Sequence, residues 1–393
     1  MPQVARPERC HACASPLENV WELPGLPLTG LYGDAPPTAA ALAQGYDQSL
    51  MRCPTCTHLQ LGSILDGGFL YGADYAFRTA GSQTASAATL FFRNWLLGLL
   101  PGGRSRTVVE FGCNDTTLLG TLADVAGERI GIDPVLAHLD PLPPGITALA
   151  ARIEDVDLSR FGSAGPDLIL CQHTLEHMPD PAALLRHLRR QAGPQAILAF
   201  EFPCADLLVA NQRFDQVFHQ HLQYFTCRSL AGLLEREGFE LIDFTFNAPH
   251  WGALLVAFRV GSAGCDRLRD CQPRLDRQRL AASLDLFRAQ MQSCAGILNS
   301  VDGPFYGYGA GQMLAVLDYH LDGAVRRCQA VIDDAPERQN RWYGNLPLAI
   351  VGSADIDFPA ASFLTTAVDS RRAIVGRLAA RGAGRIISPF LQL

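Results

Sequence analysis

Short apolar runs alternate with helix-like segments through the middle of the chain, and this alternation restricts the fold more than any other feature. The four runs are "TVVEFG", "RIGIDP", "PDLILCQ" and "AILAFEFP". Buried strands separated by helices are typical of a parallel sheet that carries helices on both faces. We therefore expect an α/β fold with a Rossmann-like sheet. Two later runs, "ELIDFTFN" and "GALLVAFRV", are expected to extend this sheet as a hairpin.

A second α/β pattern occupies the end of the chain, from "PFYGYGAGQMLAVLDYHL" to "GRIISP". At 393 residues the chain is too long for one ordinary hydrophobic core. We expect a small loop-rich domain at 1–68, the first α/β domain at 69–262, a helical connection at 263–300 and a second Rossmann-like α/β domain at 301–393.

Charge and hydropathy restrict the partners. The formal net charge is −7, and a mildly acidic chain without a basic run argues against nucleic acid. The apolar segments are too short and interrupted to span a membrane, and the N-terminus lacks the apolar core of a signal peptide. We expect a soluble cytoplasmic protein that acts on a small molecule, binds no membrane and is a monomer or a homodimer.

Two cysteine pairs near the N-terminus have the spacing of metal-binding turns. A cytoplasmic chain with twelve cysteines indicates metal binding or unreactive thiols, not a disulfide framework. Two C-x-x-C turns complete a tetrahedral zinc site, and a proline-rich segment with little core of its own needs such support. Buried thiols or a redox pair are the alternatives. His11 and His58 flank the turns as substitute ligands or, as we expect, solvated neighbours. The predicted ligands are Cys10, Cys13, Cys53 and Cys56.

The run "VVEFGCND" has the pattern of a ligand-binding turn after a buried strand. The second and third glycines of a dinucleotide fingerprint are missing, so phosphate is a poor match here. Gly112 allows the backbone close to a ligand, while Glu110 and Asp115 supply acceptors for an ammonium or hydroxyl groups. Asp133, about twenty residues on, is suited to both hydroxyls of a ribose. An adenosine ligand without phosphate fits this pattern, although an acidic loop in an unrelated α/β fold would look similar.

Polar residues at the ends of three strands complete the predicted cofactor site. Ligands of open α/β sheets bind at the carboxyl ends of strands, and "GIDP" and "CQHTLEH" both end strands. The candidate cofactor-binding residues are Glu110, Gly112, Asn114, Asp115, Asp133, Pro134 and His173.

The stretch "GYGAGQ" opens the second α/β pattern with three alternate glycines. A glycine turn between a strand and a helix is suited to phosphate, and Asp333 in "VIDD" lies near a ribose-binding position. A true nicotinamide site would make the protein an oxidoreductase. Because the glycine spacing departs from the full fingerprint, we favour a degenerate Rossmann domain that closes one wall of the acceptor site.

The motifs "EFGCNDTTLL", "GIDP" and "HTLEHM" resemble class I S-adenosylmethionine-dependent methyltransferases. The full length resembles the deoxysugar C-methyltransferases, which combine a four-cysteine zinc domain, a methyltransferase domain and a C-terminal Rossmann-like domain. The resemblance implies S-adenosylmethionine and structural zinc as cofactors, and methylation next to the keto group of a nucleotide-linked 4-keto-6-deoxysugar in deoxysugar or antibiotic biosynthesis. In that family the C-terminal domain helps to hold the nucleotide diphosphate.

Two histidines lie two residues apart in "FHQHLQYF". Methylation at carbon requires removal of a proton next to a ketone, for which a histidine with a pKa near the working pH is suited. The resemblance makes His221 the candidate base and His177 a second active-site histidine, while His219 positions the loop or the substrate. Metal binding or core packing are the alternatives. No carboxylate-rich set of metal partners is expected beside His219 and His221.

The chain departs from the family where the family has Tyr-His-Glu-His. Here Phe218 and Gln220 replace the hydroxyl and the carboxylate, and a carboxylate would raise the basicity of a nearby imidazole. Either the acceptor is more acidic, or Glu201 supplies a carboxylate, or the chemistry has changed. Tyr75, in a segment similar to the family's aromatic lid, is a candidate to replace the hydroxyl. Thr116 stands where the family commonly has glycine.

Three functions remain open from the sequence. The first is the sugar C-methyltransferase, and the second is a methyltransferase of the same fold with another natural-product acceptor or altered chemistry. The third is a binding or assembly protein that keeps the fold without catalysis. The candidate substrate-binding residues are Gln220, Glu201, His250 and Tyr308.

Overall fold

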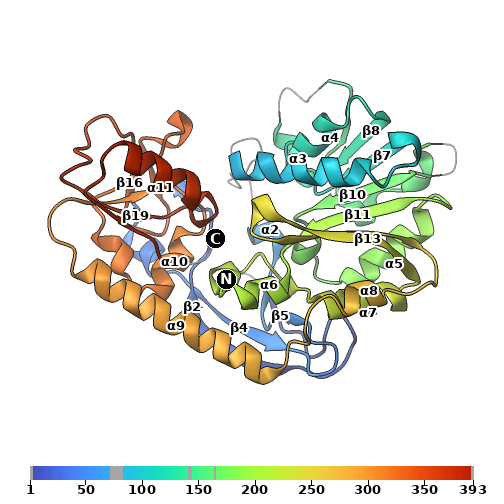
Figure 1. Cartoon of the computed structure of the whole chain (residues 1–393), viewed down its shortest axis with the longest axis horizontal. Helices are drawn as coiled ribbons and strands as arrows, with labels where there is room; N and C mark the ends of the chain where they lie inside the picture. Colours follow the sequence, from blue (N-terminus) through green and yellow to red (C-terminus); the bar gives the residue numbers. More distant parts are fainter. Residues whose placement is uncertain (1–2, 71–82, 140–143, 163–164, 391–393) are drawn as a thin grey trace.

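A computed structural model describes residues 3–70, 83–139, 144–162 and 165–390. Figure 1 shows two lobes, each built on a twisted sheet, joined below by a long helix and by strands of the N-terminal segment. In the described residues no helix is long and apolar enough to cross a membrane.

The middle of the chain forms a seven-stranded sheet in the order β13-β14-β11-β10-β7-β8-β9. The five strands from β7 to β11 run parallel, and β14 pairs antiparallel with both β11 and β13. The expected parallel α/β sheet and its hairpin extension are thus confirmed. The strands are β7 (Ser105–Phe111), β8 (Ala126–Ile132), β9 (Thr147–Leu149), β10 (Leu168–Gln172), β11 (Ile197–Phe202), β13 (Phe239–Asn247) and β14 (Ala253–Val260).

Helices cover both faces of this sheet because each presents an apolar side to it. Asp180 caps the N-terminus of α5 by accepting from the Ala183 amide, and leucines of α5 enter the core on one face. Helix α7 starts with a capping box between Thr226 and Ser229. Phe92 and Leu96 of α3 pack on the other face. The helices are α3 (Gln83–Leu97), α4 (Thr117–Thr121), α5 (Pro181–Gln191) and α7 (Cys227–Arg236).

The end of the chain forms a second seven-stranded sheet in the order β20-β19-β15-β16-β18-β17-β3. Its central strands are parallel, as the second α/β pattern predicts. The helices here are α10 (Leu314–His320) and α11 (Arg371–Ala380). The strands are β15 (Phe305–Tyr308), β16 (Val331–Ile332), β17 (Arg341–Tyr343), β18 (Ala349–Val351), β19 (Ser362–Thr365), β20 (Arg385–Ile387) and β3 (Tyr32–Gly33).

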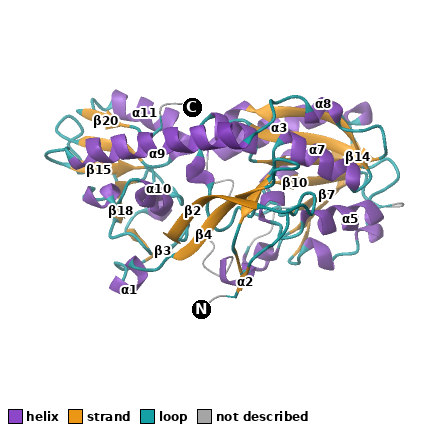
Figure 2. Cartoon of the chain, turned by 90° about the horizontal axis from the view of Figure 1, so that it is seen from below, coloured by secondary structure: helices purple, strands orange, loops and turns teal. Residues whose placement is uncertain are grey.

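The N-terminal segment contributes strands to both lobes. Its strand β3 pairs with β17 of the second lobe, and its strand β5 pairs with β12 of the first. The N-terminal segment is therefore joined by strand pairing to both α/β domains, across the boundary expected near residue 68. Figure 2 shows β2 and β4 between the two lobes. This sheet consists of β12 (Gln223–Tyr224), β5 (Leu59–Leu61), β4 (Tyr46–Arg52) and β2 (Glu18–Leu26), and a separate pair is β1 (Val4–Ala5) with β6 (Ile64–Leu65).

Helix α9 (Arg277–Asn299) lies within the expected helical connection, runs beneath the second lobe and contacts α6 (Ala205–Ala210). Trp21 of β2, Phe287 of α9 and Leu314 of α10 share one hydrophobic core. That shared core fixes the second lobe against the N-terminal sheet. The remaining short helices are α1 (Ala39–Leu42), α2 (Gly67–Leu70), α6 (Ala205–Ala210) and α8 (Asp266–Arg269).

Candidate functional site

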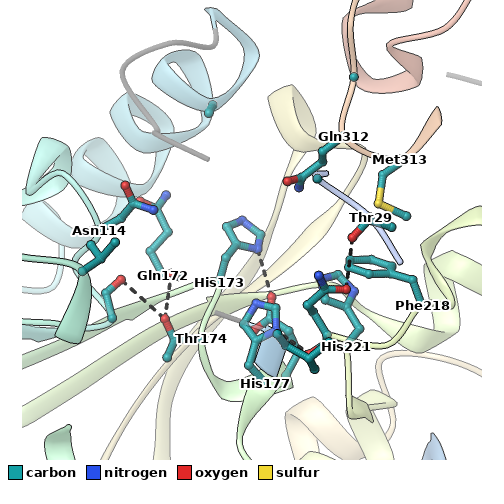
Figure 3. Close-up of a pocket in the computed structure, with 18 of the residues that line it drawn as sticks. Thr29, Asn114, Gln172, His173, Thr174, His177, Phe218, His221, Gln312 and Met313 are labelled. Carbon is teal, nitrogen blue, oxygen red and sulfur yellow. Dashed lines mark hydrogen bonds and ion pairs between the residues drawn. The ribbon is translucent and has the colours of Figure 1, made fainter. Parts of the chain in front are cut away.

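Both large sheets end at one cavity of about 1560 Å³. It is lined by residues that follow β7, β8 and β10 of the first sheet and β15, β16 and β19 of the second. These are carboxyl ends of parallel strands, where open α/β sheets bind their ligands. In Figure 3, Asn114 and Gln172 lie on one side of the cavity and Gln312 and Met313 on the other, with His173 between them.

Most of the site residues proposed from the sequence line this cavity: Glu110, Gly112, Asn114, Asp133, Pro134, His173, His177, Gln220, His221, His250 and Tyr308. Three others, Asp115, Glu201 and His219, are not among its described lining residues. Tyr75 lies outside the described residues.

The turn after β7 is held open for a ligand by Gly112 and Asp133. Gly112 has a φ of 64°, and a Cβ there would lie 1.9 Å from Thr174 Oγ1. Asp133 follows β8 and accepts from the backbone amides of Asn114 and Val135, both at 2.9 Å. These two bonds fix the turn, and a carboxylate at this strand end is of the type that binds ribose hydroxyls.

Glu110 places a buried carboxyl group beside this turn. Its side chain is 2% exposed, and Oε2 has no hydrogen-bond partner among the described residues. Burial, and then the charges of Asp115 and Asp133, raise the pKa of Glu110 well above its usual range. A buried carboxyl without a cationic partner is costly to ionise, so the turn fits a ligand that carries an ammonium.

Asp115 and Thr116 shape the start of α4. Asp115 Oδ1 accepts from Thr117 Oγ1 at 2.6 Å, which places this carboxylate at the helix terminus. Thr116 adopts a left-handed conformation with a φ of 60° and is 1% exposed. The threonine found in place of the family's glycine is thus accommodated within the turn, while the predicted ligand contact of Asp115 stays a prediction.

His173 lies at the end of β10 between two buried carboxylates. Its backbone has a φ of 51°, held by a bond from its amide to the Glu201 carbonyl at 2.8 Å. Its Nδ1 lies 3.3 Å from Glu176 Oε1, and its Nε2 lies 3.7 Å from Glu201 Oε1. Burial acts to lower the pKa of His173, but Glu176 and Glu201 outweigh it and raise the pKa to about 10.

Both carboxylates beside His173 are kept ionised. Burial favours protonation of Glu176, yet His173 and nearby histidines lower its pKa to about 2. Glu201 also has a lowered pKa, since His173 outweighs its burial, and it accepts from Gln172 at 2.8 Å and from Asn247 at 2.6 Å. The three residues therefore form a charged cluster under the cavity.

Glu176 is a candidate site residue that the sequence reasoning missed. One of the three alternatives from the sequence was that Glu201 replaces the carboxylate beside His221, but Glu201 lies beside His173. Glu176 instead has a carboxylate oxygen within 4.8 Å of ring nitrogens of both His177 and His221. The only sequence signal was its spacing of three residues from His173, which one helical turn brings together.

His177 and His221 form a ring pair at the cavity, with centroids 5.1 Å apart. His177 Nδ1 donates to the Gln220 carbonyl at 2.6 Å, which directs Nε2 away from that bond. His221 is 8% exposed, and its Nδ1 has no partner in the described part of the chain. Burial, and then His177, lower the pKa of His221 to about 3. His221 is thus a weaker base than we expected.

The neighbours of His221 in the loop have structural partners. His219 is 1% exposed and contacts Gln48 Nε2 at 3.3 Å and the Leu26 carbonyl at 3.0 Å. It therefore holds the loop, as the sequence suggested, and does not reach the cavity. Gln220 Oε1 accepts from Thr29 Oγ1 at 3.0 Å, and the Phe218 ring lies 4.1 Å from the ring of His221.

The second lobe faces the cavity with a similar turn and with arginines. Asp333 accepts from the Ala310 amide at 2.6 Å and the Ala335 amide at 2.9 Å. Tyr308 donates to Asp334 Oδ1 at 2.8 Å, and burial followed by Asp334 raises its pKa to about 12. Arginines 338, 341 and 377 line this side. The same side also carries Asp333, Asp334 and Glu337, and Arg338 and Arg377 form ion pairs with the two aspartates, so the charges here are mixed and paired.

His250 lies on the floor of the cavity against His173. Their ring centroids are 4.5 Å apart in an edge-on arrangement. Burial, and then the charge on His173, lower the pKa of His250 to about 4. His250 is therefore neutral at pH 7, and its predicted contact with the substrate stays a prediction.

The four predicted zinc ligands come together. Cys10 Sγ lies 3.6 Å from Cys56 Sγ, and Cys13 Sγ lies 3.4 Å from Cys53 Sγ. Thiolates about 2.3 Å from one tetrahedral ion would lie about 3.8 Å apart, so the cluster fits zinc. Every cysteine in the described residues is a free thiol.

The cysteine cluster is linked through Gln223 to the loop that carries His219 and His221. His58 is fully buried and lies 3.0 Å from Gln223 Oε1, while Gln223 Nε2 donates to His11 Nδ1 at 2.7 Å. The expectation of a solvated neighbour is therefore wrong for His58, whereas His11 is half-buried. Their burial arises from β12, which pairs with β5 directly after the second cysteine turn.

Comparisons with known proteins agree with this geometry. A family model described as "Methyltransferase domain" matches residues 85–243. The "C-methyltransferase NovU" of Streptomyces niveus is 26% identical over 269 residues, which cover 65% of this chain and 62% of that protein. A "Ubiquinone biosynthesis O-methyltransferase" of Hahella chejuensis is 32% identical over 106 residues, which cover 26% of this chain and 43% of that protein. The matches thus span less than two thirds of either relative.

Among solved structures, an S-adenosylmethionine-dependent methyltransferase from Mesorhizobium loti has 17% sequence identity and a TM-score of 0.36, and covers 42% of this chain and 96% of that chain. The domain match begins in α3, ends within β13 and includes the glycine turn that follows β7. Residues 85–243 are therefore a methyltransferase domain, built on the class I Rossmann-like α/β fold.

Proposed function

We propose that this chain is an S-adenosylmethionine-dependent C-methyltransferase that acts next to the keto group of a nucleotide-linked 4-keto-6-deoxysugar. One observation carries the proposal: a single cavity joins an acidic turn, a buried histidine pair and an arginine-lined second turn. The acidic turn suits a cationic methyl donor, and the arginines suit a diphosphate. The printed name of the relative from Streptomyces niveus, a C-methyltransferase, supports the same reaction class.

The donor site fits S-adenosylmethionine by the chemistry of its residues. Glu110, with an unpartnered buried oxygen, would hold the ammonium, and Asp133 would hold the ribose hydroxyls. Gly112 leaves room because a Cβ there would fill the turn. When bound, S-adenosylmethionine supplies a methyl group on an electrophilic sulfonium.

The histidine pair supplies the base. His221 is neutral and its Nδ1 is buried without a partner among the described residues, so in the tautomer with its hydrogen on Nε2 the Nδ1 nitrogen can accept a proton. The proposed step moves the proton next to the keto group onto this nitrogen. His177 is the second ring of the pair, and its hydrogen bond to the Gln220 carbonyl fixes its position beside His221. Phe218 shields the His221 ring from water, which favours transfer between the two reacting groups alone.

Proton exchange tests this function without methyl transfer. We expect the wild-type protein to exchange the proton next to the ketone of thymidine-diphosphate-4-keto-6-deoxyglucose in heavy water, followed by proton NMR. His221→Ala should slow exchange by at least about 100-fold, since a positioned general base contributes about that much. Its affinity for S-adenosylhomocysteine, measured by calorimetry, should stay within about threefold.

A matched control is His187→Gln, a histidine of α5 that does not line the cavity in the described residues. This variant should exchange at the wild-type rate. Wild-type exchange in His221→Ala would show that His221 is not the base. No exchange in the wild-type protein would remove the keto-sugar function.

A second candidate function is O-methylation of another natural-product acceptor. Phe218 has no hydroxyl and Gln220 is engaged by Thr29, so the loop offers less acid–base chemistry than a carbon acid needs. The relative from Hahella chejuensis is named an O-methyltransferase. A donor with a ¹³C-labelled methyl group separates the two, because the carbon NMR shift of the product distinguishes a C-methyl from an O-methyl group.

We also propose that the four-cysteine cluster binds one structural zinc ion. The sulfur spacing supports zinc, and the Gln223 contacts would transmit its loss to the catalytic loop. Elemental analysis of the purified chain should give one zinc per chain, and Cys53→Ser should lower that content and the stability together.

A further inference from the structure

We infer that Trp251 is a specificity-determining residue, whose indole ring forms the surface on which the apolar face of the acceptor sugar packs. This inference rests on the proposed function and extends it, because it names the part of the acceptor that the protein selects. Trp251 lies in the turn between β13 and β14, and it lines the cavity.

The backbone at Trp251 is strained. Its φ of 40° and ψ of 26° lie in the left-handed region, which bulky residues rarely adopt because the Cβ crowds the backbone. The next residue, Gly252, also has a positive φ, of 88°, and a Cβ there would lie 2.5 Å from Leu207 Cδ1. The turn therefore has glycine at one left-handed position and tryptophan at the other. Strained residues of this kind are found most often at functional sites.

Arg213 covers one face of the Trp251 ring. Its guanidinium carbon lies over the ring, 5.0 Å from the centroid, which is a cation–π contact. Arg213 is 6% exposed and is not among the described lining residues of the cavity. Trp251, by contrast, lines the cavity and is only partly buried. The indole ring therefore lies between the guanidinium and the cavity, and its uncovered side faces a ligand.

Arg213 is itself fixed by two carboxylates and a second ring. It donates to the two oxygens of Asp215 at 2.8 and 2.9 Å, and it donates to Asp369 of the second lobe at 2.9 Å. The Phe390 ring lies 5.4 Å from the guanidinium carbon. Because residues from both lobes hold Arg213, the indole ring that it supports is a fixed surface before any ligand binds, which lowers the cost of binding.

Trp251 lies between the loop that carries His221 and the second lobe. Phe218 contacts the ring of His221, with centroids 4.1 Å apart, and Trp251 packs against the same hydrophobic core as Phe218. On the other side, Arg213 connects Trp251 to Asp369. In the proposed function the sugar is held between a base in this loop and a diphosphate at the second lobe, so its ring would lie against Trp251.

An indole surface suits a 6-deoxysugar for a chemical reason. A 4-keto-6-deoxyhexose has C–H bonds on the faces of its ring and a methyl group where other hexoses have the 6-hydroxyl. Packing against indole removes this apolar surface from water, whereas a hydroxyl in the same place would be buried without a hydrogen-bond partner. Because Arg213 is already paired with Asp215 and Asp369 behind the ring, this wall offers no free cation to an anionic acceptor.

A purely structural ring is the competing explanation. Trp251 packs against a hydrophobic core, and its contact with Arg213 supports the ion pair between the lobes. A structural role predicts that loss of the ring weakens the binding of every ligand, because both lobes line the one cavity. A role in specificity predicts weaker binding of the sugar alone.

The decisive variant is Trp251→Gly, because glycine adopts this backbone conformation without strain. Exchange of the proton next to the ketone of thymidine-diphosphate-4-keto-6-deoxyglucose in heavy water gives a KM for the sugar. This KM should rise by about tenfold, since burial of one apolar ring face contributes about that factor. Affinities for thymidine diphosphate and for S-adenosylhomocysteine, measured by calorimetry, should stay within about threefold. Trp251→Phe should regain most of the wild-type KM. The matched control is Trp95→Phe, in α3 and not among the described lining residues, which should match the wild-type protein.

Tryptophan fluorescence gives an independent measurement of the contact. The nucleotide sugar should change the emission of the wild-type protein beyond the change that thymidine diphosphate causes. This difference should be lost in Trp251→Phe and kept in Trp95→Phe. A wild-type KM in Trp251→Gly, or a difference in emission that Trp251→Phe retains, would overturn the inference. Equal losses of affinity for the sugar, thymidine diphosphate and S-adenosylhomocysteine would show a structural ring and overturn it as well. No exchange in the wild-type protein would instead overturn the proposed function, and the inference with it.

Discussion

The chain contains two glycine turns of the same construction, one in each lobe, that face a common cavity. In the first, the Gly112 amide bonds to the Ile132 carbonyl, and in the second the Gly309 amide bonds to the Ile332 carbonyl. Asp133 and Asp333 then each accept from a backbone amide of the turn and from the amide two residues on. The two turns therefore have the same pattern of backbone hydrogen bonds.

The side chains around the two turns differ in how their carboxylates are paired. Two residues before Gly112 stands Glu110, whereas two residues before Gly309 stands Gly307. Three arginines line the second turn, and one of them, Arg338, lies 3.6 Å from Asp333. The same backbone design therefore lies in two electrostatic surroundings, with a buried carboxyl oxygen that is unpartnered in the described residues beside the first turn and arginine–aspartate pairs beside the second.

The largest expected effect comes from adding a methyl group to each turn. Gly112→Ala should lower the free energy of unfolding by about 2–4 kcal/mol, because a Cβ would lie 1.9 Å from Thr174 Oγ1 at a φ of 64°. Gly309→Ala, with a Cβ 2.6 Å from Ala367 Cβ, should also destabilise. Urea denaturation measures both.

The two glycine variants should differ in their affinity for S-adenosylhomocysteine. Only Gly112→Ala should lose affinity for S-adenosylhomocysteine at a temperature where both are folded. Equal loss of affinity in Gly309→Ala would contradict the assignment of the donor to the first turn.

The two aspartates give the next largest effect. Asp133→Asn should weaken S-adenosylhomocysteine binding by about 10- to 100-fold, since a hydrogen bond to a charged group contributes about 1.5–3 kcal/mol. Asp333→Asn is the matched control, and calorimetry should give nearly wild-type affinity for it. If both variants bound equally weakly, the two lobes would not divide the ligands as we propose.

A smaller effect is expected at the arginines of the second turn. Arg338→Gln should raise the KM for the nucleotide sugar by about tenfold, because one partly exposed cation–phosphate contact is lost. Its affinity for S-adenosylhomocysteine should not change. Arg186→Gln, an exposed arginine paired with Glu237 on the far side of the first sheet, is the control. A wild-type KM in Arg338→Gln would place the diphosphate elsewhere.

The smallest effect concerns the pH dependence of binding at Glu110. Its pKa is raised in the free protein, and an ammonium would favour the ionised form, so binding should release a proton. Affinity for S-adenosylhomocysteine should therefore rise with pH, by at most about tenfold per pH unit. The raised pKa also means that Glu110 itself lowers stability once pH exceeds its unfolded value. In Glu110→Gln the pH dependence of binding should disappear, and a retained slope would assign the proton to another group.

The fold was largely predictable because its strands are encoded locally. Runs such as "TVVEFG" and "PDLILCQ" became the buried strands β7 and β10, and the predicted hairpin became β13 and β14. Strands β3 and β12 could not be predicted. Each has two residues, too few for a period, and forms only because another lobe offers an edge to pair with.

The candidate site was predictable in its residues but not in its pairings. Glycine and aspartate at strand ends predicted the first turn, and the cysteine spacing predicted the sulfur cluster. Which carboxylate faces which histidine depends on how β10, β11 and the catalytic loop meet, so Glu201 was paired with the wrong imidazole. For the same reason the low pKa of His221 and the burial of His58 had no signal in the sequence.

The sequence by itself determined the two α/β patterns, the turn residues and the kinds of side chain in the site, because these depend on neighbours along the chain. Only the tertiary structure decided that the two turns face one cavity and that two carboxylates hold His173 charged while burial keeps His221 neutral. Proton affinities depend on distances of a few ångströms between segments remote in sequence, and packing alone sets those distances.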